Sequence, residues 1–261
     1  MTGPLRRWWR QRIIARAALD PALWEQTLQR LPFLGGLTTD ERARLRDTVI
    51  LFLHSKSIHG AAGLVIDDGM RLMIAAQACI LILNLDVDYF SGWVEVIVYP
   101  DEFVPTIEYV DDAGIVHTER EARAGEAWLQ GPVILSWADV APVAEGVNVV
   151  IHEFAHKLDM LNGDANGFPP LHKGMARQAW ASAFSAAYTD FCRRVEVEED
   201  LAIDPYAAEN PGEFFAVVSE AFFDTPRVVL AEYPEIYAQL KAFYRQDPAA
   251  RAAVQLRDAI R

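Results

Sequence analysis

Two histidines stand four residues apart in the stretch VVIHEFAHKLDML, residues 149–161, and a glutamate directly follows the first. On a helix with about 100° of rotation per residue, His152 and His156 share one face, and two imidazoles one turn apart can bind a single tetrahedral zinc ion. Glu153 is rotated by about 100° from His152, which keeps its carboxylate off the metal but near the water that the metal would activate. The spacing therefore predicts a zinc site with Glu153 as general base, in preference to a helix whose histidines only pack or cap.

A catalytic zinc usually takes a third protein ligand. The residues after His156 offer no further histidine at a fixed short distance, so we expect a carboxylate from the segment ENPGEFFAVVSEAFFDTP, residues 209–226. Glu213 falls at the third position of a helix that Asn210 would cap, so it could bind the metal or complete a capping box. Glu220 lies on almost the same helical face and is either the rival ligand or a hydrogen-bond partner of a ligand. The residues alone leave both glutamates open.

Other polar residues near this motif have more ordinary explanations. Asp159 shares the face of the two histidines, and we expect it to accept a hydrogen bond from one of them rather than to point into solvent. The acidic stretch VEVEEDLAID, residues 195–204, could favour the cationic amine of a substrate or form a solvated loop. The remaining histidines have no partner at metal spacing and are expected in the surface or core: His54, His59, His117 and His172.

The apolar pattern predicts helices, then a small sheet, then helices again. Residues 1–85 are helical in pattern, and MIAAQACILILNL, residues 73–85, predicts a buried helix too short to span a membrane. Strands are predicted by WVEVIVYP (93–100), by TIEYV and GIVHTE on either side of a turn at 111–114, and by PVILSW (132–137). PVILSW precedes the histidine helix and could bind an extended peptide by strand addition; its more ordinary role is that of a core strand, and the two roles are compatible. This order predicts an α+β fold, mainly helical with a small mixed sheet.

Composition narrows the class of protein. The chain has 261 residues, 52% of them apolar, and a formal net charge of −13, so it can build a core and should repel nucleic acid. The basic start LRRWWRQRIIAR, residues 5–16, is expected to be an amphipathic helix packed on the domain, with a membrane-surface or partner-binding helix as the alternative. Cys79 and Cys192 offer neither a disulfide framework nor a cysteine zinc cluster. We expect a soluble cytoplasmic protein without a transmembrane segment or a signal peptide.

Several motifs in order resemble one known family. HEFAHKLD followed by YAAENPGEFFAVVSEAFF resembles the MtfA (Mlc titration factor A) family of bacterial zinc metallopeptidases. KSIHGAAGL, IAAQACILIL, YFSGWVEVIVYPDEF and GPVILSWADV are similar to the same family. The match runs over nearly the whole chain and is weakest before residue 25.

The resemblance implies a zincin-like, gluzincin-type metallopeptidase fold, related in its core to anthrax lethal factor. It implies one Zn²⁺ per chain, held by His152, His156 and Glu213, with Glu153 as the base. The family also has a tyrosine seven residues before the ligand glutamate, a spacing that Tyr206 has from Glu213 and that favours Glu213 over its rival. The resemblance makes Tyr206 a donor to the developing oxyanion, where its position alone would suggest a surface loop residue.

The resemblance further implies aminopeptidase-like activity on short peptides and binding of Mlc, a glucose-responsive transcription repressor. The alternative function is a non-catalytic regulatory protein that sequesters such a repressor, with structural zinc. We expect a helical N-terminal region, residues 1–85, packed on a zincin-like catalytic region, residues 86–261, as one continuous unit.

Overall fold

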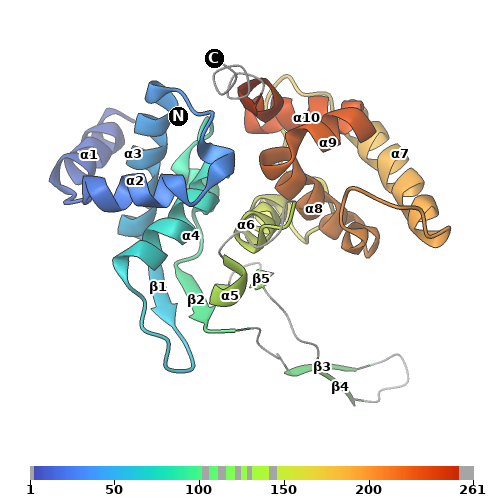
Figure 1. Ribbon diagram of the computed structural model, residues 1–261, viewed down its shortest axis with the longest axis horizontal. Coiled ribbons are helices and arrows are strands. Elements are labelled where there is room, and N and C mark those ends of the chain that lie inside the picture. Colours follow the sequence, from blue (N-terminus) through green and yellow to red (C-terminus); the bar gives the residue numbers. More distant parts are fainter. Residues whose placement is uncertain are drawn as a thin grey trace.

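The computed structural model describes residues 3–101, 106–110, 116–120, 125–127, 131–140 and 146–252. Two groups of helices stand on either side of a middle layer (Figure 1). The first group is α1 (Pro4–Arg16), α2 (Pro21–Gln29) and α3 (Thr39–Ser55), and the second is α7 (Arg177–Glu196), α8 (Pro211–Asp224), α9 (Pro226–Glu232) and α10 (Pro234–Tyr244). Between them lie α4 (Asp68–Leu81) and α6 (Val149–Asp159), near a small sheet. None of the described helices is long and apolar enough to cross a bilayer.

The sheet has four strands, in the order β1 (Ser57–Gly60), β2 (Glu95–Tyr99), β6 (Val133–Ser136) and β5 (Gly125–Ala127). The first three are parallel, with Ile58 opposite Val96, and β5 runs antiparallel to β6. A separate antiparallel hairpin pairs β3 (Thr106–Val110) with β4 (Val116–Arg120), as TIEYV and GIVHTE predict. A small mixed sheet among many helices confirms the predicted α+β class; the predicted turn at 111–114 lies outside the described residues.

The strand PVILSW is not at an edge of this sheet. It forms β6, which is paired on both sides, and Val133 and Leu135 are fully buried. The expectation that this strand could receive an extended peptide is therefore wrong, because both of its edges are paired, and the expectation of a core strand is confirmed. The strand beyond it is β5, whose three residues carry too short a pattern for sequence reasoning to find.

The N-terminal helices form as their sequence predicts. Thr38 accepts a hydrogen bond from the backbone N–H of Glu41, and the Glu41 carboxylate accepts one from the N–H of Thr38, so a capping box begins α3. The apolar run after Met73 is buried in α4, which ends at Leu81. The reading of residues 1–85 as wholly helical is wrong, because SIHG forms β1 and pairs with β2. A segment of four residues is too short for its alternation to give a reliable local strand signal.

One hydrophobic core runs through both helical groups and the sheet, with buried members from Trp24 to Ala249. Helix α3, the segment from η2 (Val87–Phe90) to Trp93 and helix α6 meet in an aromatic cluster with ring centroids 5.1 to 6.4 Å apart: Phe52, Phe90, Trp93 and Phe154. The buried ammonium of Lys56 lies 3.9 Å from the Trp93 ring centroid and donates to the carbonyls of Phe90 and Trp93. This cluster fixes the back of α6 and so positions its other face.

Candidate metal centre

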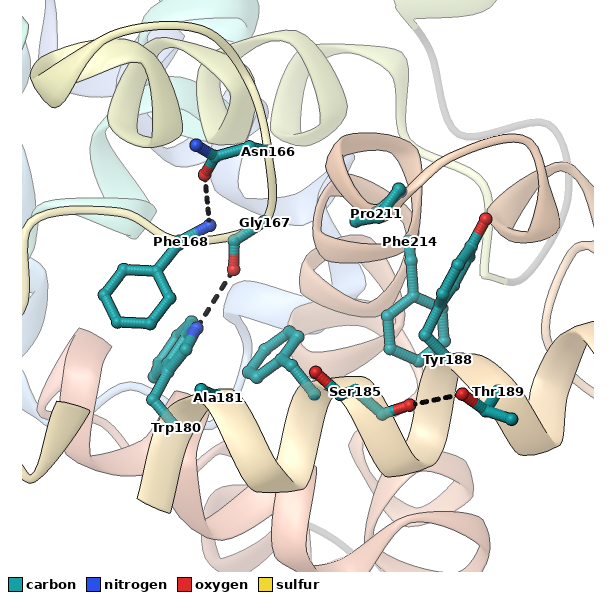
Figure 2. Close-up of a pocket in the computed structure, with 11 residues that line it drawn as sticks. Asn166, Gly167, Phe168, Trp180, Ala181, Ser185, Tyr188, Thr189, Pro211 and Phe214 are labelled. Carbon is teal, nitrogen blue, oxygen red and sulfur yellow. Dashed lines mark hydrogen bonds between the residues drawn. The ribbon is translucent and has the colours of Figure 1, made fainter. Parts of the chain in front are cut away.

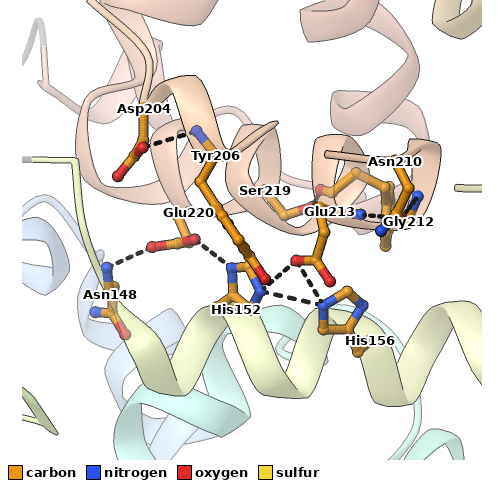
Figure 3. Close-up of polar contacts among 11 residues, drawn as sticks. Asn148, His152, His156, Asp204, Tyr206, Asn210, Gly212, Glu213, Ser219 and Glu220 are labelled. Atoms are coloured by element: carbon orange, nitrogen blue, oxygen red, sulfur yellow. Dashed lines mark hydrogen bonds and ion pairs between the residues drawn. The ribbon is translucent and has the colours of Figure 1, made fainter. Parts of the chain in front are cut away.

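The first turn of helix α6 is capped, and one apolar face of the helix packs in the core. The Asn148 side chain accepts a hydrogen bond from the N–H of Ile151 at 2.9 Å, which satisfies a free donor of the first turn. Five apolar side chains of the helix are fully buried: Val150, Ile151, Phe154, Ala155 and Leu158. Burial of that face directs His152 and His156 toward α8 (Figure 3).

Three donor atoms converge between α6 and α8. His152 Nε2 lies 2.9 Å from Glu213 Oε2, and His156 Nε2 lies 3.2 Å from the same oxygen. The two Nε2 atoms are 3.1 Å apart. A tetrahedral zinc with ligands at about 2.0–2.1 Å holds its ligand atoms about 3.3 Å from one another. His152, His156 and Glu213 could therefore hold a metal ion, and no other such cluster occurs among the described residues.

The imidazole of His152 is oriented from its far side. Its Nδ1 lies 2.6 Å from Glu220 Oε1, and the other oxygen of Glu220 accepts a hydrogen bond from the N–H of Asn148 at 2.5 Å. When the imidazole is neutral and its Nδ1–H donates to Glu220, Nε2 presents its lone pair toward His156 and Glu213. A cation placed among these atoms would relieve their mutual repulsion. Of the two glutamates that the residues left open, Glu213 faces both histidines and Glu220 contacts one from behind.

The charges at this centre favour a bound cation. Burial alone would raise the pKa of Glu213, but hydrogen bonds with His152 and His156 lower it well below its usual range, so its carboxylate is ionised. Burial disfavours the charged form of His152, yet Glu220 and Glu213 outweigh this and raise its pKa well above the usual value. The His152 and Glu213 side chains keep 13% and 17% of their surface exposed, so an ion can reach them from solvent.

Glu153 lies beside the donor atoms in a dry environment. It is 5% exposed, and its Oε2 has no hydrogen-bond partner in the part of the chain that is described. Burial raises its pKa to about 7, although His152 and His156 oppose the rise. Gly125 of β5 covers it so closely that a Cβ atom at position 125 would lie 2.4 Å from Glu153 Oε1. Sequence reasoning missed Gly125, because no local pattern marks a contact between a strand and a helix.

Tyr206 extends from η4 (Pro205–Ala208) toward His152 and Glu213 (Figure 3). Its ring centroid lies 6.1 Å from that of His152, and 53% of the residue is exposed. Asp204 fixes the start of η4 by accepting a hydrogen bond from the N–H of Tyr206 at 2.9 Å. The phenol is thus at the solvent side of the three donors.

Helix α8 begins where the sequence predicts. Asn210 accepts hydrogen bonds from the N–H groups of Gly212 and Glu213 at 2.9 and 3.0 Å, and Pro211 occupies the first position of the helix. The Glu213 carboxylate faces His152 and His156 instead of completing a capping box. The backbone N–H of Glu213 therefore takes part in the helix cap, while its side chain takes part in the candidate metal centre.

Asp159 has a different role from the one expected. Its Oδ2 accepts hydrogen bonds from the N–H groups of Asn166 and Gly167 at 2.7 and 2.6 Å, so it holds the loop after α6. Its Oδ1 and the Nδ1 of His156 are buried and have no hydrogen-bond partner within the described ranges. Among the other histidines, His172 contacts Tyr89 and the carbonyl of Phe243, His54 contacts the ring of Trp9, and the side chain of His117 is outside the described part.

A cavity of about 330 Å³ lies between α7 and the start of α8 (Figure 2). Trp180 and Phe214 form part of its apolar wall, and Trp180 Nε1 donates to the carbonyl of Gly167 at 2.9 Å. Its lining includes none of the three candidate metal donors. The cavity and the candidate metal centre are therefore separate features, and the loop held by Asp159 lines the cavity.

Comparison with known proteins assigns the chain to a family. The sequence model of the family described as glucose-regulated metallo-peptidase M90 matches residues 5–245, which include every residue of the centre. Proteins called Mlc titration factor A from Salmonella gallinarum and Salmonella typhimurium are each 39% identical over 238 residues, 88% of this chain and 88% of theirs. The protein of that name from Salmonella arizonae is 39% identical over 236 residues, 88% of this chain and 92% of its own. The chain therefore belongs to the glucose-regulated metallo-peptidase M90 family, which confirms its resemblance to the Mlc titration factor A proteins.

Proposed function

We propose that this protein is a zinc-dependent metallopeptidase of gluzincin type with aminopeptidase-like activity. The observation that carries the proposal is the convergence of His152, His156 and Glu213 beside the buried carboxylate of Glu153. Two imidazoles and one carboxylate are a common ligand set of catalytic zinc, which leaves a position open for substrate. Zinc, when bound, would supply a Lewis acid that polarises the scissile carbonyl and makes water a better nucleophile.

Glu153 would move the protons of the reaction. A carboxylate with a pKa of about 7 can accept a proton from the attacking water near neutral pH and later return it to the leaving amine. Its Oε2 has no other hydrogen-bond partner among the described residues, so it is available to the water. Tyr206 would donate its O–H to the oxyanion, from a partly exposed position that a substrate can cover.

The aminopeptidase-like specificity rests on the family resemblance and on charge. Several exposed acids lie on the segment before Tyr206: Glu198, Glu199, Asp200 and Asp204. A negative rim attracts the cationic amine of a peptide N-terminus. We place the protein in the cytoplasm, where free Cys79 and Cys192 stay reduced, and expect no direct contact with nucleic acid.

The first experiment compares hydrolysis of an alanine anilide by the wild type and by Glu153→Gln at matched zinc content. We expect the variant to keep its zinc and to lose about 10²- to 10⁴-fold in rate, the size of a lost acid and base group. Equal turnover by both proteins would exclude the proposed base. Inactivity of both with zinc bound would favour the second function.

The second function is that of a regulatory protein that sequesters an Mlc-like transcription repressor without catalysis, with structural zinc. The names of the relatives, Mlc titration factor A, favour it. It is tested by titrating a purified Mlc-like repressor with the wild type and with Glu153→Gln. Equal binding by both, without peptide hydrolysis by either, would support this function, whereas absence of binding would exclude it.

A further inference from the structure

Helix α1 has no buried residue, whereas each of the other described helices of nine or more residues has several. Every residue of α1 keeps part of its surface exposed, and Leu5, Trp8 and Trp9 are 82%, 56% and 53% exposed. Large apolar side chains grouped on one exposed helix usually mark a surface that binds something. The expected amphipathic packing of this helix on the domain is therefore only partial.

The arginines of α1 divide between two faces. Arg10 pairs with Asp86 at 2.9 Å and with Asp88 at 2.8 Å, and Arg6 also pairs with Asp88, so these ion pairs fix the inner face of the helix. At about 100° per residue, Leu5, Trp8, Trp9, Arg12 and Arg16 all fall within an arc of about 100° on another face. Arg12 and Arg16 have no acidic partner among the residues that the structure describes, and Arg12 lies 5.4 Å from the Trp8 ring centroid.

This second face borders a cleft of about 350 Å³ between α1 and α3. Its apolar part comes from Trp9, Ile13 and Ile50, its cationic part comes from Arg12 and Arg16, and His54 also lines it. An apolar floor beside the guanidinium groups of Arg12 and Arg16 suits an amphipathic anion. A phosphate would meet the arginines while hydrocarbon covers the tryptophan and the isoleucines.

We propose that the second face of α1 docks on the surface of an anionic phospholipid membrane. Arginine next to exposed tryptophan and leucine is the composition of helices that lie in a membrane interface. The formal net charge of −13 would make an anionic surface repel the protein as a whole, so a basic face is needed for the approach, and this face of α1 supplies one. The inner ion pairs with Asp86 and Asp88 keep α1 on the protein while the second face contacts lipid.

The test uses the full chain and sedimentation with vesicles. We expect binding to vesicles of phosphatidylcholine with phosphatidylglycerol, no binding to phosphatidylcholine alone, and loss of binding at high salt. The double variant Arg12→Ser, Arg16→Ser should lower the partition coefficient about 25-fold, since each arginine contributes about fivefold. Trp8→Ser should weaken binding as well, because it removes the apolar part of the contact. A matched control is Arg46→Ser, Arg227→Ser, which removes the same charge from exposed positions outside α1.

Three results would overturn the proposal: no vesicle binding by the wild type, equal binding to neutral vesicles, or equal partitioning of the two double variants. Sedimentation velocity without lipid tests the alternative that a second copy of the chain binds this face. A concentration-dependent dimer lost in the α1 double variant, together with no vesicle binding, would assign the face to a second copy of the chain. Unchanged circular dichroism and zinc content of the variants establish that their folds are intact.

Discussion

Glu220 Oε1 lies 2.6 Å from His152 Nδ1, on the side of the imidazole opposite to Glu213. The two glutamates are seven residues apart on α8, so one helix supplies both the carboxylate that faces the donors and the carboxylate that orients a histidine from behind. The distance between His152 and α8 therefore controls both contacts. This arrangement gives the two glutamates separable effects on metal binding.

Glu220→Ala should lower zinc affinity about 10- to 100-fold, because the histidine loses its orienting partner. Glu213→Ala should release zinc under mild dialysis, because it removes a ligand. Competition with a chromophoric chelator measures both constants. Glu209→Ala is the matched control, since Glu209 is exposed on the segment before α8. A larger loss in Glu220→Ala than in Glu213→Ala would show that the ligand assignment is reversed.

Gly125→Ala should lower peptidase activity about 10²-fold without loss of zinc. The added methyl group would collide with the Glu153 carboxylate and displace it, and displacement of a reacting group by about 1 Å costs rate on this scale. Steady-state kinetics at matched zinc content measures the effect. Gly69→Ala is the control, because Gly69 lies in the first turn of α4, away from this contact. Full activity of Gly125→Ala would show that Glu153 does not need its present position.

Tyr206→Phe should lower kcat about 10²- to 10³-fold with little change in KM, because an oxyanion donor acts mainly in the transition state. Zinc affinity should stay unchanged, since the phenol is not among the three donors. Tyr233→Phe serves as the control, because the Tyr233 hydroxyl contacts Asp190 and Arg194 instead. An unchanged kcat would show that Tyr206 does not stabilise the oxyanion and is only a surface tyrosine.

Asn148→Ala should lower the free energy of unfolding by about 2–4 kcal/mol, from loss of the α6 cap and of a buried hydrogen bond. The Asn148 amide donates to Gln77 Oε1 at 2.7 Å, and Gln77 is fully buried. Urea unfolding of the metal-free protein measures the change. Thr38→Ala removes an exposed cap and should cost only about 1 kcal/mol. Equal losses in the two variants would mean that the buried bond contributes nothing.

Lys56 should make stability depend on pH in the alkaline range. Burial lowers its pKa to about 8, below the ordinary value of 10.5, so the unfolded chain binds the proton more tightly between these values. The free energy of unfolding should therefore rise by about 1–2 kcal/mol between about pH 8 and about pH 9.5.

Lys56→Met should reduce that rise, which urea unfolding at several pH values would measure. A part of the rise should persist, because burial also lowers the pKa of Lys157 to about 8. Lys173→Met, at an exposed position, should leave the rise unchanged. A steeper rise in Lys56→Met than in the wild type would contradict the assignment.

Local sequence patterns predict the parts of the centre that lie on one helix. The four-residue spacing of His152 and His156 specifies a shared face, and the bounds of α3 and α8 follow from their caps. Glu213 and Glu220 could not be separated in this way, because two residues on one helical face are equivalent until the neighbouring helix is placed. The family resemblance favoured Glu213 through the spacing of Tyr206, in agreement with the side of His152 on which each glutamate lies.

Tertiary contacts between distant segments could not be predicted from the sequence. Gly125 meets Glu153 where β5, which pairs with β6, packs against α6, and the three residues of β5 carry no strand signal. Asp159 shares the histidine face as expected, yet the loop N–H groups of Asn166 and Gly167 reach its carboxylate. The division into residues 1–85 and 86–261 stays a prediction, although β1 belongs to the sheet and not to a purely helical region.

The donors come from distant parts of the chain: 61 residues separate His152 from Glu213. A ribosome-bound chain that has been translated only through α7 would contain both histidines but lack the carboxylate. The complete donor set forms only when α8 has been synthesised and has docked on α6. Tight metal uptake by a nascent chain would therefore report completed tertiary assembly, and truncation before residue 213 should abolish it even where α6 is already helical.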